Sequence, residues 1–282
     1  MKHKNFKFKK RWLLTAIAIT LIASELFFFS IRRFDVLVQE VSLEKTHDDL
    51  KGMKIVFISD LHFGFNMNSE LFDDVINWVN KLDADVILFG GDLFDHPSTL
   101  LPDQSMQLVV SSGLSRMNAN IAKIAVLGNH DYESKLTSTM TTQVLQDGGF
   151  NVLVNQMQRL EVGIGAIQIV GIDSSILGNP NIEQSLALVN EEELVLVLTH
   201  TPDTVLKLPT QKVDWQLSGH SHGGQIALPW IGPIVTPPDS RKFTHGTYDV
   251  NSIRLDITNG LGTTGIKARF FANPSIHLFI LK

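Results

Sequence analysis

The chain opens with one long apolar run and then changes to short apolar runs separated by polar positions. Residues 12–31 form a stretch of about 20 residues with a single charged side chain, Glu25. A helix of this length rises about 30 Å, which is the thickness of the hydrocarbon core of a bilayer. The pattern therefore predicts an N-terminal hydrophobic helix that anchors the chain in a membrane.

Beyond residue 34 the apolar positions become periodic. Three runs typical of buried strands occur at 53–59, 86–89 and 121–127. Between and after these runs the apolar positions have helical spacing, at residues 68–80, 103–117 and 134–147. This alternation of short apolar runs with amphipathic segments indicates parallel strands joined by helices.

The second half of the chain is dominated by short β patterns. They occur at 151–154, 158–162, 166–172, 194–198, 214–218, 225–228, 245–250 and 252–257, and an earlier one lies at 36–43. We find no repeat and no linker after residue 50. The expected organisation is a basic N-terminus with a membrane-anchor helix (1–33) and one α/β domain (34–282). The expected fold is two packed mixed β-sheets flanked by helices, an α/β/β/α sandwich.

The charge distribution predicts how the chain sits in the membrane. Residues 1–33 carry eight basic side chains, six of them before Trp12, against one acidic side chain. Basic residues before an apolar span favour a cytoplasmic N-terminus, so we expect a cell-membrane protein whose domain lies outside the cytoplasm. A helix lying on the cytoplasmic face stays open, because Arg32 and Arg33 follow the run and Glu25 would be accommodated more easily there. A cleaved signal peptide is disfavoured because no A-x-A site ends the run.

The rest of the chain is acidic, with 16 Lys and Arg against 28 Asp and Glu. A general nucleic-acid-binding surface needs a basic stripe, so we expect no nucleic-acid partner. The chain has no cysteine, which excludes disulfides, thiolate metal sites and cysteine nucleophiles.

Five polar clusters lie just past the ends of predicted strands, where ligands bind in open α/β sheets. They are Asp60-x-His62, Asp92-x-x-Asp95, Asn129-His130-Asp131, His200 and His220-x-His222. Imidazoles, carboxylates and an amide carbonyl suit divalent metals, and these donors are too many for one tetrahedral ion. The clusters predict two metal ions that share a bridging carboxylate.

The ordered pattern D-x-H, G-D-x-x-D, G-N-H-D, H and G-H-x-H resembles the signature of the calcineurin-like metallophosphoesterases, over residues 36–282. The segments Gly223–Ile226 and Gly260–Gly265, together with Pro229, resemble a bacterial membrane-associated subgroup of that family. The resemblance implies that 34–282 is a metallophosphoesterase catalytic domain.

The resemblance also implies roles for individual residues. Asp92 would bridge two divalent ions (Mn, Fe or Zn), and His130 would be an outer-sphere acid oriented by Asp60 or Asp131. The first ion would be held by Asp60, His62, Asp92 and His222, and the second by Asp92, Asn129, His200 and His220. Asp95 is expected to support these ligands from outside. Arg269 is the best arginine candidate for contact with the substrate phosphate.

The implied reaction is hydrolysis of a phosphodiester or pyrophosphate by hydroxide held between the two metals. The predicted anchor favours a lipid-linked substrate. A broad-specificity phosphodiesterase outside the cytoplasm fits the charge rule. A UDP-2,3-diacylglucosamine pyrophosphatase of lipid A synthesis requires a cytoplasmic site. A non-catalytic scaffold is disfavoured because every expected ligand position is occupied.

Overall fold

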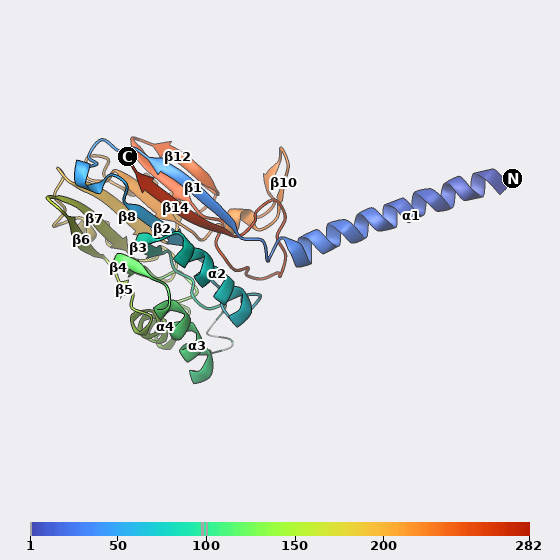
Figure 1. Cartoon of the computed structure of the whole chain (residues 1–282), viewed down its shortest axis with the longest axis horizontal. Coiled ribbons are helices and arrows are strands. Elements are labelled where there is room, and N and C mark those ends of the chain that lie inside the picture. The colour runs from blue at the N-terminus through green and yellow to red at the C-terminus, as the bar shows by residue number, and fades with distance from the viewer. Residues whose placement is uncertain (1, 97–98, 100) are drawn as a thin grey trace.

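The computed structural model describes residues 2–96, 99 and 101–282, with side chains from residue 12 onward (Figure 1). The basic side chains predicted to set the orientation of the N-terminus at residues 2–11 lie outside this description. The α-helices are α1 (Lys2–Ser24), α2 (Ser69–Lys81), α3 (Gln104–Ser115), α4 (Lys135–Asp147) and the short α5 (Ile182–Ser185). The three central helices begin where the sequence predicts, because the side chains of Asn68, Asp103 and Ser134 accept backbone N–H groups at their N-termini.

Two six-stranded mixed sheets form the centre of the domain. In spatial order the first contains β1 (Asp35–Val41), β14 (Ser275–Leu281), β2 (Lys54–Ile58), β3 (Ala84–Phe89), β4 (Ala119–Ala125) and β5 (Asn151–Val152). The second contains β12 (Gly246–Val250), β13 (Ile253–Ile257), β9 (Trp215–Ser218), β8 (Leu194–Thr199), β7 (Gly165–Ile172) and β6 (Gln156–Val162). A separate hairpin pairs β10 (Ala227–Leu228) with β11 (Gly232–Pro233).

Alternation along the strands creates the layers. In β2, Ile55 and Phe57 point into the core between the two sheets, whereas Val56 and Ile58 point into a core shared with the helices. Helices α2, α3 and α4 cover the outer face of the first sheet (Figure 1). The predicted fold of two packed mixed sheets with helices is confirmed. The outer face of the second sheet is covered more thinly than expected, by α5 and a 3₁₀ turn at Pro202–Lys207.

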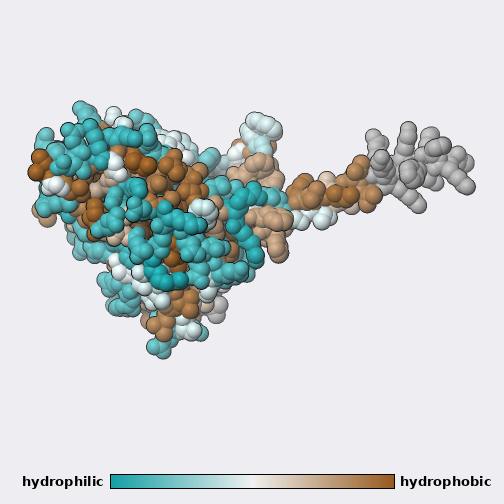
Figure 2. Space-filling view, in the orientation of Figure 1, coloured by the Kyte–Doolittle hydropathy of each residue, from teal (hydrophilic) through white to brown (hydrophobic). Residues whose placement is uncertain are grey.

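The N-terminal helix stands away from the domain. Its apolar part, Trp12–Phe29, has a mean hydropathy of 2.0 and contributes no buried residues (Figure 2). A π-helical turn, Glu25–Phe29, directly follows α1. Oε1 of Glu25 lies 2.8 Å from a guanidinium nitrogen of Arg33. Among the described residues this is the one helix with the length and composition of a membrane anchor or signal sequence.

The sheet topology brings the predicted clusters together. Strands β2, β3 and β4 are parallel, and so are β8 and β9, so within each sheet their carboxyl ends lie at one edge. The Nδ1 of His200, which follows β8, lies 2.7 Å from the carbonyl oxygen of Gly90, which follows β3. The two edges therefore face one another and form a single site.

A buried histidine in the first sheet is expected to make folding sensitive to acid. His277 on β14 lies 3.2 Å from the Oγ of Ser275, and its burial lowers its pKa to about 4 although Asp256 opposes the shift. The unfolded chain binds this proton near pH 6.5, so the stabilisation is present above that pH and is lost as the pH falls towards 4. Between about pH 7.5 and pH 5 the wild type should lose about 2 kcal/mol more unfolding free energy than His277→Gln, measured by urea titration. Parallel losses in the two proteins would contradict this origin of acid sensitivity.

Candidate metal centre

The residues of the site occupy sharply turned backbone just past the strand ends. Asp60, His62, Asp92, His220 and His222 all have positive φ angles, between 45° and 66°. Non-glycine residues adopt this conformation at a cost of about 1–3 kcal/mol, and such strain concentrates at functional sites. The chain accepts it here because each sharp turn directs a polar side chain across the shared edge.

Two glycines allow the turns to approach the carboxylates closely. A Cβ at Gly128 would lie 2.2 Å from Oδ1 of Asp92, and a Cβ at Gly219 would lie 2.2 Å from Oδ2 of Asp60. These distances are far below van der Waals contact. Glycine is therefore required beside each carboxylate.

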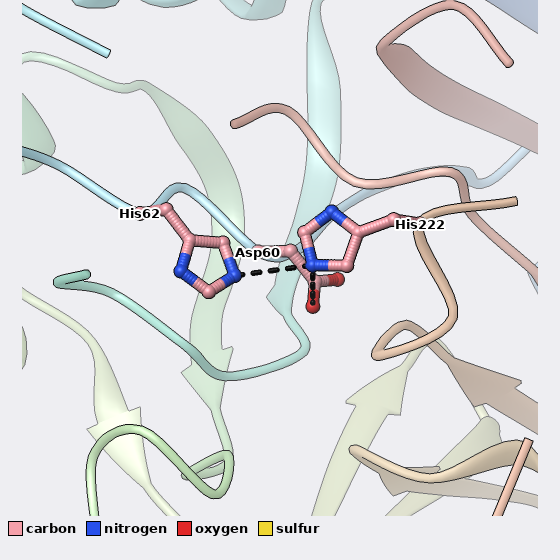
Figure 3. Close-up of side chains that lie close together, drawn as sticks. All are labelled: Asp60, His62 and His222. Atoms are coloured by element: carbon pink, nitrogen blue, oxygen red, sulfur yellow. Dashed lines mark hydrogen bonds and ion pairs between the residues drawn. The ribbon is translucent and has the colours of Figure 1, made fainter. Parts of the chain in front are cut away.

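A first triad consists of Asp60, His62 and His222 (Figure 3). The Nε2 atoms of His62 and His222 lie 3.1 Å apart, and Nε2 of His222 lies 3.6 Å from Oδ1 of Asp60. One ligand atom from each residue falls within 4.8 Å of the others, and all three residues are buried. This set can hold a divalent cation.

A second triad consists of Asp92, His200 and His220. Nε2 of His200 lies 3.2 Å from both Oδ2 of Asp92 and Nδ1 of His220. The same Oδ2 lies 3.7 Å from Nε2 of His62 in the first triad. Asp92 therefore stands between the two triads, as a bridging carboxylate would.

Outer contacts direct the metal-facing nitrogens. Nδ1 of His200 donates to the Gly90 carbonyl oxygen, and Nε2 of His220 donates to that of Pro238 at 2.9 Å. When these imidazoles are neutral, as metal binding requires, the opposite nitrogens carry lone pairs that point into the site. Nδ1 of His62 lies 3.2 Å from Oδ1 of Asp95, as expected for an outer support.

In the chain without metal, the buried carboxylates of the site carry negative charge that a positive group must balance. Burial favours the neutral acid of Asp92, yet His200 and His130 hold its pKa well below the ordinary value. Burial opposes protonation of His200, but Asp92 and Asp60 raise its pKa to about 10. Burial lowers the pKa of His220 to about 4, with help from His200, and leaves this imidazole neutral. A proton on His200 thus balances the carboxylates where a metal ion would otherwise do so.

An unpaired amide oxygen completes the donor set. Oδ1 of Asn129 is buried and has no hydrogen-bond partner among the described residues. Leaving a buried carbonyl unpaired costs about 1–3 kcal/mol, so such an atom calls for a ligand. Asn129 lines the same pocket as Asp92 and His220. These donors fit two divalent ions of the Mn, Fe or Zn type.

His130 lies beside the triads and is held by a residue that the sequence analysis missed. Its Nε2 lies 4.0 Å from Oδ2 of Asp92, and its Nδ1 lies 2.9 Å from Oε1 of Glu133. The exposed His96 contacts the same Glu133 oxygen at 2.8 Å. Burial opposes protonation of His130, but the negative charges of Asp92 and Glu133 outweigh this effect and raise its pKa. The signal for Glu133 was its position three residues after His130, just before the helix that Ser134 caps.

Asp60 and Asp131, the residues expected to orient His130, accept hydrogen bonds from other groups. The carboxylate of Asp131 accepts backbone N–H groups from Asp92 at 2.8 Å, Leu93 at 3.1 Å and Gly128 at 2.8 Å. Asp131 therefore ties two of the ligand-bearing loops together. Asp60 accepts from the N–H of His220 at 3.0 Å. The expectation that Asp60 or Asp131 orients His130 is wrong, because Glu133 occupies that place.

Arg269 lies inside the wall of the site. Its side chain is fully buried, and the guanidinium donates to the carbonyl oxygens of Ala272 and Asn259 at 2.7 Å and of His222 at 3.3 Å. The predicted substrate contact is corrected accordingly, since this guanidinium presents no surface to the pocket. Arg269 instead anchors the loop that carries His222.

The two triads open into a pocket of about 500 Å³. Its polar floor includes Asp92, Asn129, His130, His220 and His222. Its walls are mainly apolar, formed by Ile176, Ile226, Ile234, Val235, Pro237, Pro238 and Ile266. A substrate with a polar phosphate and apolar flanks matches this division.

Paired His and carboxylate triads around one shared carboxylate, at the common edge of two mixed sheets, define a dinuclear metal hydrolase. The family model of the calcineurin-like phosphoesterases matches residues 53–224, and the chain belongs to this family. It is a metal-dependent phosphoesterase with a buried His and Asp dimetal site.

Curated relatives agree with this placement. The chain is 38% identical over 232 residues to the uncharacterized metallophosphoesterase YkuE of Bacillus subtilis, covering 82% of this chain and 79% of that one. It is 27% identical over 222 residues to the phosphodiesterase YaeI of Escherichia coli, covering 77% of each. The solved phosphopantetheinyl hydrolase PptH of Mycobacterium tuberculosis aligns with a TM-score of 0.46 at 10% identity, over 75% of this chain and 91% of that one.

Replacing Glu133 with Gln should lower kcat for phosphodiester hydrolysis by about 10–100-fold, with KM nearly unchanged. Glutamine keeps the shape but removes the charge that holds the Nδ1 proton of His130. Steady-state assays check this, with Glu161→Gln as the matched control because Glu161 is exposed on β6. A kcat equal to that of the control would exclude a role for Glu133 in orienting His130.

Proposed function

We propose that this protein hydrolyses a lipid-linked phosphodiester or pyrophosphate from a membrane-anchored position. The observation that carries the proposal is one cavity with two kinds of surface. Residues that could hold two metal ions form its floor, and apolar side chains form most of its walls. The apolar N-terminal helix supplies the second support, since the catalytic domain would then work beside a bilayer. The relative YaeI bears the name phosphodiesterase, which favours diesters over monoesters.

Seven side chains of the site would hold the two metal ions. When bound, two divalent ions would supply Lewis-acid charge for the phosphoryl oxygens and lower the pKa of water. Asp60, His62 and His222 would hold one ion, and His200, His220 and Asn129 the other, with Asp92 between them.

His130 would give a proton to the leaving oxygen from Nε2. Glu133 keeps the other nitrogen, Nδ1, fixed at 2.9 Å. Glu133, which lies outside the two triads, is one of the groups that raise the pKa of His130, and its charge would favour the protonated imidazole that this role requires. The apolar walls of the pocket would exclude bulk water from the flanks of a bound phosphate.

Topology belongs to the same proposal. We place the catalytic domain outside the cytoplasm, because basic residues precede the helix. The cysteine-free chain allows a direct test with a single exposed cysteine at Ile164, which is 86% exposed. Labelling by a membrane-impermeant maleimide in intact spheroplasts supports this placement. Labelling only after lysis overturns it and favours the cytoplasmic face.

The substrate test uses the full chain in detergent with Mn²⁺. Three substrates are compared: a phospholipid diester, UDP-2,3-diacylglucosamine and bis-p-nitrophenyl phosphate. A kcat/KM at least about tenfold higher for a lipid substrate than for the soluble diester supports the proposal, and Asp92→Asn serves as the inactive control. Preference for the nucleotide lipid would select the pyrophosphatase. Equal or better use of the soluble diester would overturn the lipid assignment.

A further inference from the structure

The hairpin that follows the histidine pair exposes large apolar side chains. Strands β10 and β11 present Trp230 at their tip, which is 103% exposed, followed by Ile231, which is 78% exposed. Trp230 also has a positive φ of 65°, so the turn is tight and lifts the tryptophan outward. Exposing a cluster of large apolar side chains to water is unfavourable, so such a cluster marks an interaction surface.

The segment 269–271 connects this hairpin to the end of the N-terminal helix. The N–H of Arg269 donates to the carbonyl oxygen of Leu26 at 3.0 Å, and the N–H of Ala227 donates to that of Phe270 at 2.8 Å. Phe271, which is 66% exposed, lies on the connecting segment. Figure 1 shows the hairpin on the side of the domain from which the helix leaves.

The domain has little freedom to stand away from the helix. The apolar stretch ends at Phe29, and the next residues, Ser30 and Ile31, are already buried at 1% and 9% exposure. Strand β1 begins at Asp35. If the helix crosses a bilayer, the face of the domain at its base must therefore lie at the membrane surface.

The base of the hairpin is also a wall of the catalytic pocket. Ile226 and Ile234 line the pocket, and the N–H of Ile234 donates to the carbonyl oxygen of Ile226 at 3.0 Å. The tip residues lie outside the pocket lining. The hairpin thus connects the wall of the catalytic pocket to the exposed apolar tip.

Exposed cations accompany these apolar side chains. Arg32 follows the helix, and Lys267 lies beside Ile266 and two residues before Arg269. Tryptophan and basic side chains together are typical of the interfacial layer of a membrane, where anionic headgroups meet the acyl chains.

We propose that the β10–β11 hairpin tip, Trp230–Ile231, and Phe271 form a second membrane contact that holds the pocket opening at the level of the lipid headgroups. This inference rests on the proposed function and adds the way in which a lipid phosphate reaches the metals. The enzyme would take its substrate directly from the bilayer surface, without lifting the acyl chains into water. The occupant of this surface is the bilayer itself.

Site-specific fluorescence tests the contact in the full chain. Because the sequence has no cysteine, Ile231→Cys and the control Ile164→Cys each carry one environment-sensitive dye. Ile164 lies in the turn between β6 and β7. Figure 1 shows these two strands on the side of the domain opposite the helix. Both proteins are reconstituted into vesicles of phosphatidylethanolamine and phosphatidylglycerol with shallow spin-labelled lipids.

If the hairpin contacts the membrane, lipid spin labels should quench the dye at residue 231 several-fold more strongly than the dye at 164. Aqueous iodide should show the opposite order. Quenching of the 231 dye by iodide alone would overturn the contact. Protection of that dye from both quenchers would also overturn it, because a protein surface such as a second copy would then cover the hairpin.

An activity comparison separates this inference from the proposed function. In Trp230→Ser/Ile231→Ser, KM for a diester lipid in vesicles should rise several-fold while hydrolysis of bis-p-nitrophenyl phosphate is retained. Equal activity of the variant and wild type on vesicle lipid would contradict the inference. A membrane-quenched hairpin in an enzyme that ignores lipid diesters would refute the proposed function and leave the membrane contact intact.

Discussion

Asp92→Asn should lower kcat/KM for phosphodiester hydrolysis by about 10³-fold or more, the largest effect expected from any single change. Oδ2 of Asp92 lies 3.2 Å from His200 and 3.7 Å from His62, so one atom serves both triads. Asparagine keeps the volume of the side chain but removes the negative charge between the two cations. The loss should therefore include metal affinity as well as turnover.

Metal analysis and steady-state kinetics check this prediction together. Asp147→Asn is the matched control, because Asp147 is exposed at the end of α4 and remote from the triads. A normal thermal melting profile for Asp92→Asn would show that the fold is retained. Wild-type kcat/KM in the variant would show that Asp92 does not bridge the metals.

His130→Ala is expected to lower kcat by about 10²–10⁴-fold while the metal content stays unchanged. The side chain lies 4.0 Å from the Asp92 carboxylate and belongs to neither of the two triads that share it. A proton donor matters most for a poor leaving group. The loss should therefore be larger for an alkyl diester than for a p-nitrophenyl diester.

The control for this change is His245→Ala, at an exposed position. His130 also falls into groupings with His62 and Asp95 and with His96 and Glu133, each of which could bind a cation. The leaving-group comparison distinguishes these roles. Loss of metal with equal effects on both diesters would make His130 a ligand and remove it as the acid.

Local patterns were sufficient to predict the two sheets and the place of the site. Buried-strand runs such as 86–89 end at polar residues, and parallel strands place such ends at one edge. The structure brings the predicted donors of all five clusters together at that edge. Their assignment as ligands to particular ions remains a prediction.

Contacts that depend on tertiary packing could not be predicted from the sequence. Glu133 reaches His130 because α4 begins at Lys135 and fixes the turn before it. The residue type of Arg269 predicts a phosphate contact, yet five backbone carbonyl oxygens enclose its guanidinium inside the domain. Neither outcome follows from residue type or spacing, because each requires knowing which loops meet.

The most direct measurement is anomalous diffraction from crystals of the full chain grown with Mn²⁺. The account predicts two strong peaks about 3.5–4 Å apart, one against Asp60, His62 and His222 and the other against His200, His220 and Asn129, with Asp92 contacting both. A single peak, or manganese bound only away from these side chains, would contradict the dimetal centre.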